Sequence, residues 1–326
     1  MLGDARIGWT HMKCIQKRVR DTNLMVQQFS TGKNGPKVVI TANIHGDECT
    51  GLGVIIRLLE ELSAYLYCGD IWLFPSLNPA GLQRSLRVFP DDGQDLNRLF
   101  PGGAQGSQSQ KHIYAIASTL QTINPDLVLD LHTDSGSSIP YVLLDRALET
   151  KNKKIEASLL DIAQASHLTP VWEYHIQAYI RYRLDKTLSG FALNTLGIPS
   201  LTLEVGPRRS MDIAAVTLMK DAVLGILSHL KMLQKPFTPA HSPQKGIWKR
   251  AKSPVSNVTG VIFPSCVPGS ILGKGDEIAK IYSTTGVVQE TFVAQERVLV
   301  LAFPDQCWVR AHQSCATLAK EVHPAP

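Results

Sequence analysis

His45 and Glu48 lie three residues apart, between an apolar run at 38–40 and a helical pattern that begins near Thr50. An imidazole nitrogen and a carboxylate oxygen at such a turn can point into one cleft above a sheet. Zn²⁺ accepts both kinds of ligand, and catalytic zinc sites usually combine three protein ligands with water. Because His-x-x-Glu pairs also occur by chance in surface loops, this pair predicts a metal site only if other parts of the chain complete it.

Two further residues have the right chemistry. Residues 126–131 alternate as a strand that ends at His132, and residues 200–205 form another predicted strand that contains Glu204. Ligands of parallel sheets bind outside the carboxyl ends of the strands. The alternatives are a hydrogen-bonded histidine at a strand end and a carboxylate buried in a core strand, but an unpaired buried charge is costly. His45, His132 and Glu204 each lie at or near the end of a predicted strand, and these three placements together predict one site.

The elements that must position these residues alternate between strands and helices. This order predicts an α/β fold with a mixed, mostly parallel sheet and helices on both faces. Leu24–Phe29 is expected to be an edge strand, and residues 172–190, which are rich in Tyr, Arg and His, are expected to form a loop or lid over the site. The other predicted strands cover 37–42, 71–74, 126–131, 141–144 and 200–205, and the predicted helices cover 51–66, 111–123, 154–165 and 213–233.

The length of 326 residues favours two domains, or one large α/β domain with an appendage. The composition changes at 234–239, and the residues that follow show short strand-like runs separated by turns. We therefore predict a catalytic domain at 1–235 and a small β-rich C-terminal domain at 245–326.

Charge and cysteine content limit the partners and the compartment. The net charge is +5, from 33 basic and 28 acidic residues, and no long Lys/Arg block occurs, so no nucleic-acid partner is predicted. No run of 18 apolar residues and no signal-peptide pattern is present, so no membrane association is predicted. The six cysteines form no C-x-x-C pair, which favours reduced thiols and a cytoplasmic location.

Five motifs, in their order and spacing, resemble those of the succinylglutamate desuccinylase/aspartoacylase family, zinc deacylases related to the M14 zinc carboxypeptidases. The resemblance covers roughly residues 35–235, and the later Pro/Gly-rich strands are similar to the β-rich C-terminal domain of the same family. It implies a zinc carboxypeptidase-like fold. The motifs are His45-Gly46-Asp47-Glu48, Asn78-Pro79-Ala80-Gly81, Asp95-Leu96-Asn97-Arg98-Leu99-Phe100-Pro101-Gly102, Asp130-Leu131-His132-Thr133 and Leu203-Glu204-Val205-Gly206.

The resemblance implies that His45, Glu48 and His132 bind one Zn²⁺ per chain. It also implies that Glu204 is the general base, which takes a proton from the attacking water and passes it to the leaving amine. Arg87 would contact the substrate carbonyl oxygen and stabilise the developing negative charge. For this last role Arg84 is the competing candidate.

Asn97 and Arg98 would hold a substrate carboxylate, because the planar guanidinium suits a bidentate contact. Asp95 resembles the residue that orients a zinc-binding histidine, here His45. Asp130 is an alternative orienting residue, since it precedes His132 by two positions on a strand and faces the same side. The roles of other residues stay open: a second carboxylate site or solvated charges for Arg208 and Arg209, and pocket lining for Tyr179, Arg181 and Tyr182.

These expectations describe a zinc-dependent hydrolase that removes an acyl group from the nitrogen of a small acylated amino acid or amine. The expected partner is a small-molecule substrate with a carboxylate, and a homo-oligomer is left open. One alternative is a zinc carboxypeptidase or peptide amidase that acts on short peptides. The other is a non-catalytic binding protein with the same fold. The sequence names neither the acyl group nor the amine.

Overall fold

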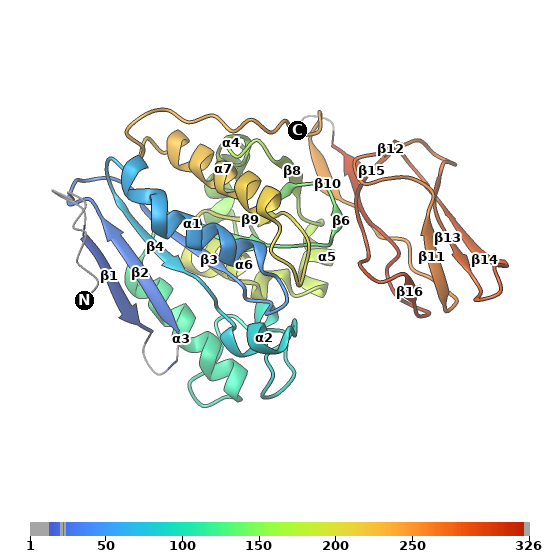
Figure 1. Ribbon diagram of the computed structural model, residues 1–326, viewed down its shortest axis with the longest axis horizontal. Helices are drawn as coiled ribbons and strands as arrows, with labels where there is room; N and C mark the ends of the chain where they lie inside the picture. The colour runs from blue at the N-terminus through green and yellow to red at the C-terminus, as the bar shows by residue number, and fades with distance from the viewer. Residues whose placement is uncertain (1–12, 20–21, 23, 323–326) are drawn as a thin grey trace, which may run out of the picture.

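The computed structural model describes residues 13–19, 22 and 24–322, and a thirteen-stranded sheet runs through it (Figure 1). The strand order is β1-β2-β4-β3-β5-β9-β7-β8-β10-β17-β15-β12, with β6 beside β15. The strands of this sheet are β1 (Lys13–Arg18), β2 (Met25–Ser30), β3 (Lys37–Ala42), β4 (Asp70–Phe74), β5 (Leu127–His132), β6 (Ser137–Ser138), β7 (Tyr141–Leu144), β8 (Thr169–Trp172), β9 (Ser200–Glu204), β10 (Trp248–Arg250), β12 (Ile271–Leu272), β15 (Val298–Phe303) and β17 (Thr317–Glu321).

The sheet is mixed, as predicted. Strands β4, β3, β5 and β9 are parallel to one another, and so are β7, β8 and β10. Between these two groups β7 runs antiparallel to β9, and antiparallel pairs also form both ends of the sheet. Because the chain direction reverses at β7, the start of β7 lies beside the end of β9, with Tyr141 opposite Glu204.

Helices cover both faces, which confirms the predicted α/β fold. On one face, α1 (Thr50–Tyr65), α4 (Lys153–Gln164) and α7 (Ile213–His229) pack against alternate strand residues such as Val38 and Ile40. On the other face, α3 (Gln108–Ile123) and α6 (Leu188–Phe191) pack around Val39 and Val128. Helices α1 and α7 lie side by side (Figure 1). The shorter helices are α2 (Pro79–Arg84), α5 (Ile176–Arg181), the 3₁₀ turns η1 (Leu96–Arg98), η2 (Thr150–Asn152) and η3 (Leu184–Lys186), and the π turn η4 (Ala192–Leu196).

Three local expectations were wrong. Strand β2 is not at the edge, because β1 pairs outside it. Helix α7 ends at His229 rather than at 233, since Lys231 adopts a left-handed conformation with φ 59° that a helix cannot continue through. Residues 172–190 contain α5, η3 and the start of α6 rather than a plain loop, because short hydrogen-bonded turns satisfy the backbone there, although the stretch does cover the cavity described below, as expected.

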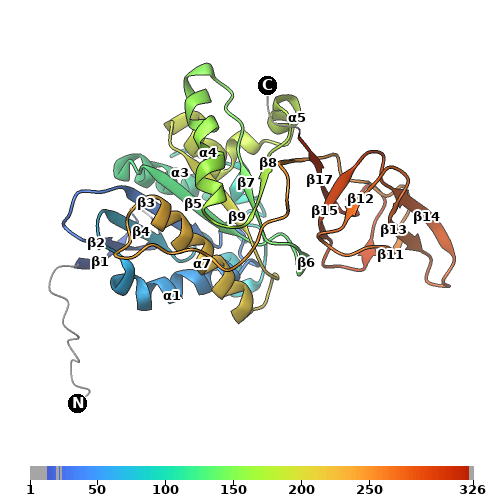
Figure 2. The ribbon, with the colours of Figure 1, turned by 90° about the horizontal axis from the view of Figure 1, so that it is seen from above.

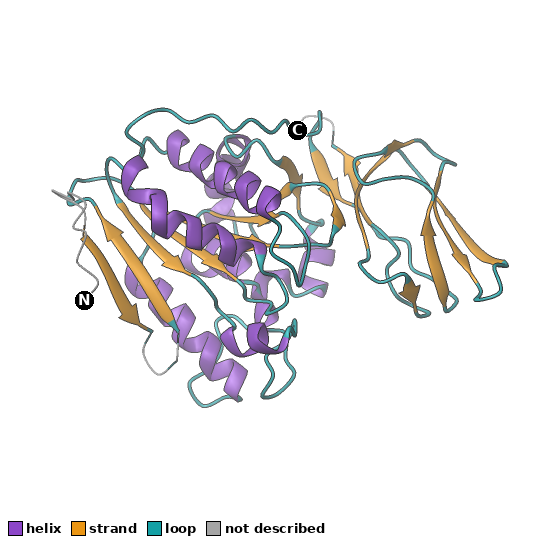
Figure 3. Cartoon of the chain, viewed as in Figure 1, coloured by secondary structure: helices purple, strands orange, loops and turns teal. Residues whose placement is uncertain are grey.

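The C-terminal residues form two parts. Strands β10, β17, β15 and β12 extend the large sheet, whereas a second, four-stranded antiparallel sheet stands apart with the order β14-β13-β11-β16. Figure 2 shows this small sheet at the end of the molecule away from β1 and β2, and Figure 3 shows it without helices. Its strands are β11 (Gly260–Pro264), β13 (Glu277–Tyr282), β14 (Val288–Val293) and β16 (Trp308–Val309). Hydrogen bonds between β8 and β10 therefore cross the predicted domain boundary, which itself stays a prediction.

Within the described part of the chain, no helix is both long enough and apolar enough to cross a membrane.

Candidate metal centre and active-site cavity

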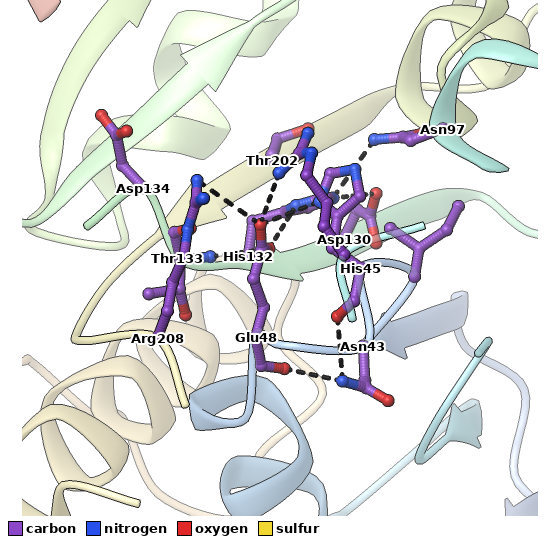
Figure 4. Close-up of polar contacts among 12 residues, drawn as sticks. Asn43, His45, Glu48, Asn97, Asp130, His132, Thr133, Asp134, Thr202 and Arg208 are labelled. Atoms are coloured by element: carbon purple, nitrogen blue, oxygen red, sulfur yellow. Dashed lines mark hydrogen bonds and ion pairs between the residues drawn. The ribbon is translucent and has the colours of Figure 1, made fainter. Parts of the chain in front are cut away.

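His45, Glu48 and His132 converge at the carboxyl ends of β3 and β5 (Figure 4). The Nδ1 atom of His45 lies 2.8 Å from Glu48 Oε1, and the Nδ1 atom of His132 lies 2.8 Å from Glu48 Oε2. All three side chains are buried, and one potential ligand atom from each lies within 4.8 Å of the others. The three predicted ligands are thus brought together in space.

A strained turn holds the first two residues of this cluster. Asn43 adopts a left-handed conformation with φ 58°, and its side-chain amide donates hydrogen bonds to the carbonyls of His45 (3.0 Å) and Glu48 (2.9 Å). Gly46 packs so tightly that an added Cβ would lie 2.2 Å from the backbone of Gly81. The Asn78-Pro79-Ala80-Gly81 motif therefore supports the His45 turn by close backbone contact.

Each histidine is oriented by its own aspartate. Asp95 Oδ1 lies 3.2 Å from His45 Nε2, and Asp130 Oδ2 lies 2.8 Å from His132 Nε2. Thr41 donates a hydrogen bond of 2.7 Å to the second oxygen of Asp130 and fixes its position. The Nε2 atom of each ring faces its aspartate, which leaves both Nδ1 atoms facing Glu48. In metal sites, carboxylates commonly fix the ligating imidazole rings in this way. Asp95 and Asp130 thus contact different histidines and do not compete for one.

The chemistry of these donors fits a divalent metal ion. Burial acts to raise the pKa of Glu48, but the two imidazoles outweigh it and hold this pKa well below its usual range. Burial acts to lower the pKa of His132, but Asp130 and Glu48 outweigh it and hold this pKa well above its usual range. Two nitrogens and a carboxylate, surrounded by further negative charge, form the donor set that suits Zn²⁺.

A cavity of about 470 Å³ opens beside the cluster. Its floor is one face of the sheet, where alternate residues point inward: Thr202 and Glu204 from β9, and Tyr141 and Leu143 from β7. Glu204 Oε2 is buried and has no hydrogen-bond partner among the described residues. Burial raises the pKa of Glu204 to about 8, and the nearby carboxylate of Glu48 adds to this rise. A buried carboxyl with a free oxygen is thus available next to the candidate metal centre.

Arginines flank this end of the cavity. Arg87 Nη1 lies 3.1 Å from Glu48 Oε1, and its Nη2 lies 3.4 Å from Asp95 Oδ2. Arg208 Nη2 lies 3.9 Å from Glu48 Oε1, and its Nε donates to the carbonyl of Thr133. The structure therefore places two guanidinium groups against the carboxylate of Glu48, and one of them, Arg87, is the residue predicted for the carbonyl oxygen.

The competing Arg84 is exposed in α2 and does not line the cavity. The two residues predicted to bind a carboxylate do line it. Asn97 is buried, and its Nδ2 lies 3.4 Å from His132 Nε2 while its Oδ1 accepts from the backbone of Leu188. Arg98 donates a hydrogen bond of 2.7 Å to the carbonyl of Asn97.

The residues left open divide between the cavity and its surroundings. Arg208 and Tyr182 line the cavity, whereas Arg209 is exposed and pairs with Asp47 at 3.7 Å. Tyr179 is fully buried behind the wall, where its hydroxyl donates to Asp145 at 2.6 Å. Arg181 is exposed and contacts the Tyr182 hydroxyl.

Sequence reasoning missed several polar residues that line this cavity. Each carries a partial signal except Arg250: Asp145 directly follows a predicted strand, Asp134 directly follows the motif at 130–133, and four residues lie in 172–190, the stretch expected to cover the site. These residues are Asp134, Asp145, Glu173, Tyr174, Thr187, Ser189 and Arg250.

Comparison with known proteins agrees with this architecture. An aspartoacylase-family protein from Mesorhizobium loti superposes with a TM-score of 0.79 at 20% identity and covers 98% of both chains. The product-bound ectoine utilization protein of Ruegeria pomeroyi gives a TM-score of 0.77 at 18% identity, covering 94% of this chain and 93% of its own. Both chains have the α/β fold described above.

The catalytic-domain model of the succinylglutamate desuccinylase/aspartoacylase family matches residues 34–230, and the chain belongs to this family. The N-alpha-acetyl-L-2,4-diaminobutyric acid deacetylase of Halomonas elongata is 23% identical over 293 residues, which are 88% of this chain and 83% of that protein. Mouse carboxypeptidase M is 27% identical over 177 residues but covers only 46% of this chain and 39% of its own, which supports the predicted relation to carboxypeptidases. Desuccinylase, aspartoacylase and deacetylase are names of acyl-removing hydrolases, so this is the class of enzyme to which the family belongs.

Proposed function

We propose that this protein is a zinc-dependent hydrolase that cleaves the amide bond of a small N-acylated amino acid. The observation that carries the proposal is the buried cluster of His45, Glu48 and His132, oriented by two aspartates and open to a cavity that contains the unpartnered oxygen of Glu204. The family match and the similarity to the Halomonas deacetylase support the proposal.

His45 Nδ1, His132 Nδ1 and Glu48 would hold the metal. When bound there, Zn²⁺ would polarise an amide carbonyl and make water nucleophilic at neutral pH. Glu204 then accepts a proton from the attacking water and donates it to the nitrogen of the leaving amine. Arg87 stabilises the negative charge that develops on the carbonyl oxygen. The substrate carboxylate binds Arg98, and Asn97 helps to fix this end of the cavity.

A carboxypeptidase function is the second candidate, because the carboxypeptidases share part of the sequence. The extent of the two matches favours the deacylase. The match covers 83% of the length of the Halomonas enzyme but only 39% of the length of carboxypeptidase M. A cavity of about 470 Å³ also suits a small molecule better than an extended peptide.

The test is amine release by zinc-loaded protein from N-acetyl-2,4-diaminobutyrate, N-acetylaspartate, N-succinylglutamate and short peptides. We expect hydrolysis of at least one N-acyl amino acid and a loss of about 10²- to 10⁴-fold in kcat for Glu204→Gln, as for a removed general base. Zinc content measured on the same samples should be unchanged. Glu149→Gln, which alters an exposed carboxylate outside the cavity, is the matched control and should retain wild-type rates. Cleavage of peptides alone, or equal rates for Glu204→Gln and wild type, would contradict the proposal.

A further inference from the structure

Arg250 reaches the cavity from the start of the predicted C-terminal domain. It ends β10, which pairs in parallel with β8 so that Trp248 lies opposite Val171 and Lys249 opposite Trp172. The next position along each strand places Arg250 beside Glu173, and Glu173 in turn beside Asp145 after β7. Because strand side chains alternate, Arg250 faces the cavity and Lys249 points to the opposite side.

The guanidinium of Arg250 has no hydrogen-bond or ion-pair partner among the described residues. Its Nε is buried without a partner, and its aromatic neighbour is Tyr174, whose ring centre lies 5.2 Å from Cζ. Glu173 is the adjacent carboxylate, but its oxygens lie more than 4.0 Å from the guanidinium nitrogens of Arg250, too far for an ion pair. Arginine cannot lose its proton to escape the cost of burial. The group therefore has an unused capacity to bind an anion in the cavity.

Arg98 also lacks a carboxylate partner within ion-pair distance among the described residues. Its guanidinium donates to the backbone carbonyl of Asn97. Burial lowers the pKa of Arg98; the charges of Arg87 and Arg250 act in the same direction, whereas those of Asp95 and Glu173 act against it. Arg98 and Arg250 are thus two like charges that face one cavity from η1 and β10, and an anion bound between them would relieve their repulsion.

We propose that Arg250 is a specificity-determining residue that, together with Arg98, binds a carboxylate of the substrate. This inference rests on the proposed deacylase function and adds to it a residue from the C-terminal part of the chain. A guanidinium recognises a carboxylate through two parallel hydrogen bonds, which a lysine or an amide cannot reproduce. The enzyme should therefore discriminate against acylated amines that lack the carboxylate.

The test compares N-acetyl-2,4-diaminobutyrate with N-acetyl-1,3-diaminopropane, which lacks only the carboxylate, and with N-succinyl-1,3-diaminopropane, which carries one on the acyl group. We expect Arg250→Gln to raise KM for a carboxylate-bearing substrate by about 10- to 100-fold, the loss typical of a charged hydrogen bond, with little change in kcat. Arg250→Lys should recover part of the loss. Lys249→Gln removes the same charge from the other side of the strand and should behave as wild type.

The pattern of losses identifies which carboxylate is bound. A loss confined to the diaminobutyrate compound assigns Arg250 to the amino-acid carboxylate, and a loss confined to the succinyl compound assigns it to the acyl carboxylate. An equal loss on all three substrates, accompanied by a lower Tm, would show that Arg250 only balances the charge of Glu173, and would overturn the proposal. Unchanged KM values would overturn it as well.

Calorimetric titration separates this inference from the deacylase function. Diaminobutyrate and 1,3-diaminopropane are titrated into wild-type and Arg250→Gln protein, so no turnover is needed. One outcome is that no substrate is hydrolysed, yet diaminobutyrate binds more weakly to Arg250→Gln than to wild type. In that case the carboxylate site is supported and the proposed reaction is wrong. If hydrolysis occurs and Arg250→Gln neither weakens ligand binding nor changes substrate preference, the reaction stands and this inference fails.

Discussion

Replacing Asp145 by Asn should change how stability depends on pH. Asp145 is 3% exposed, and burial raises the pKa of its carboxyl to about 7, with the charge of Glu173 acting in the same direction. In the unfolded chain the same carboxyl titrates near 3.8. The folded protein therefore binds more protons at this site than the unfolded chain, so this carboxyl costs stability progressively as the pH rises from about 4 to about 7.

The size of the effect follows from the two pKa values. A difference of about 3 pKa units corresponds to about 4 kcal/mol in total, of which about 2 to 3 kcal/mol is lost between pH 5 and pH 8. The asparagine side chain of the variant cannot ionise and avoids this loss. Its altered hydrogen bond with Tyr179 shifts stability by an amount that is the same at both pH values, so it cancels from the comparison.

Urea unfolding of metal-free wild type and Asp145→Asn at pH 5 and pH 8 measures the difference directly. Relative to wild type, the variant should gain about 2 to 3 kcal/mol in unfolding free energy between the two pH values. Asp161→Asn, which alters an exposed carboxyl on α4, is the matched control and should show no such gain. If the stability difference between wild type and Asp145→Asn is the same at both pH values, Asp145 ionises normally and the reasoning from its burial is wrong.

Three further predictions concern the metal centre. Asp130→Asn should weaken zinc binding by about 10- to 100-fold, because the amide orients His132 less firmly than the carboxylate does. Competition with a chromophoric chelator measures the zinc affinity, and an unchanged affinity would argue against the orienting role. Arg87→Gln should lower kcat by about 10²- to 10³-fold while zinc content is retained, and steady-state kinetics with parallel metal analysis would expose a structural effect instead. Excess zinc should raise the Tm of wild type but not of His45→Ala, as calorimetry can show, since a ligand stabilises only a folded protein that binds it.

The cluster of His45, Glu48 and His132 could be predicted because its residues occupy local, recognisable positions. His45 and Glu48 share one turn, His132 ends a strand, and Glu204 ends the neighbouring strand, so parallel pairing alone brings them together. The same local rule suggested Asp130 as an orienting residue, because residues two apart on a strand face the same side. The structure adds that Asp95 and Asp130 act on different histidines.

The far part of the cavity could not be predicted, because it depends on long-range strand order. Glu173 and Asp145 become neighbours when β8 pairs with β7, and Arg250 joins them only when β10 inserts between β8 and β17. Nothing in the three residues of β10 indicates this pairing, and the sequence around it is rich in Pro and Lys, which is not typical of a strand inside a sheet. The edge strand was predicted wrongly for a related reason: the sequence of β1 has no apolar pattern that would predict its pairing with β2.

One signal inside the strands would have located the cavity more completely. Strand β5 is buried along its whole length, yet Asp130 and His132 alternate with leucines, and in β9 Thr202 and Glu204 alternate with Leu201 and Leu203. Buried polar groups are rarely left without a partner, so polar residues at every second position of a buried strand mark a face that meets other polar groups or a ligand. The apolar residues between them define the opposite, packed face. Period-two polarity within apolar strands thus predicts which face of the sheet carries the chemistry, even where strand order does not follow from the sequence.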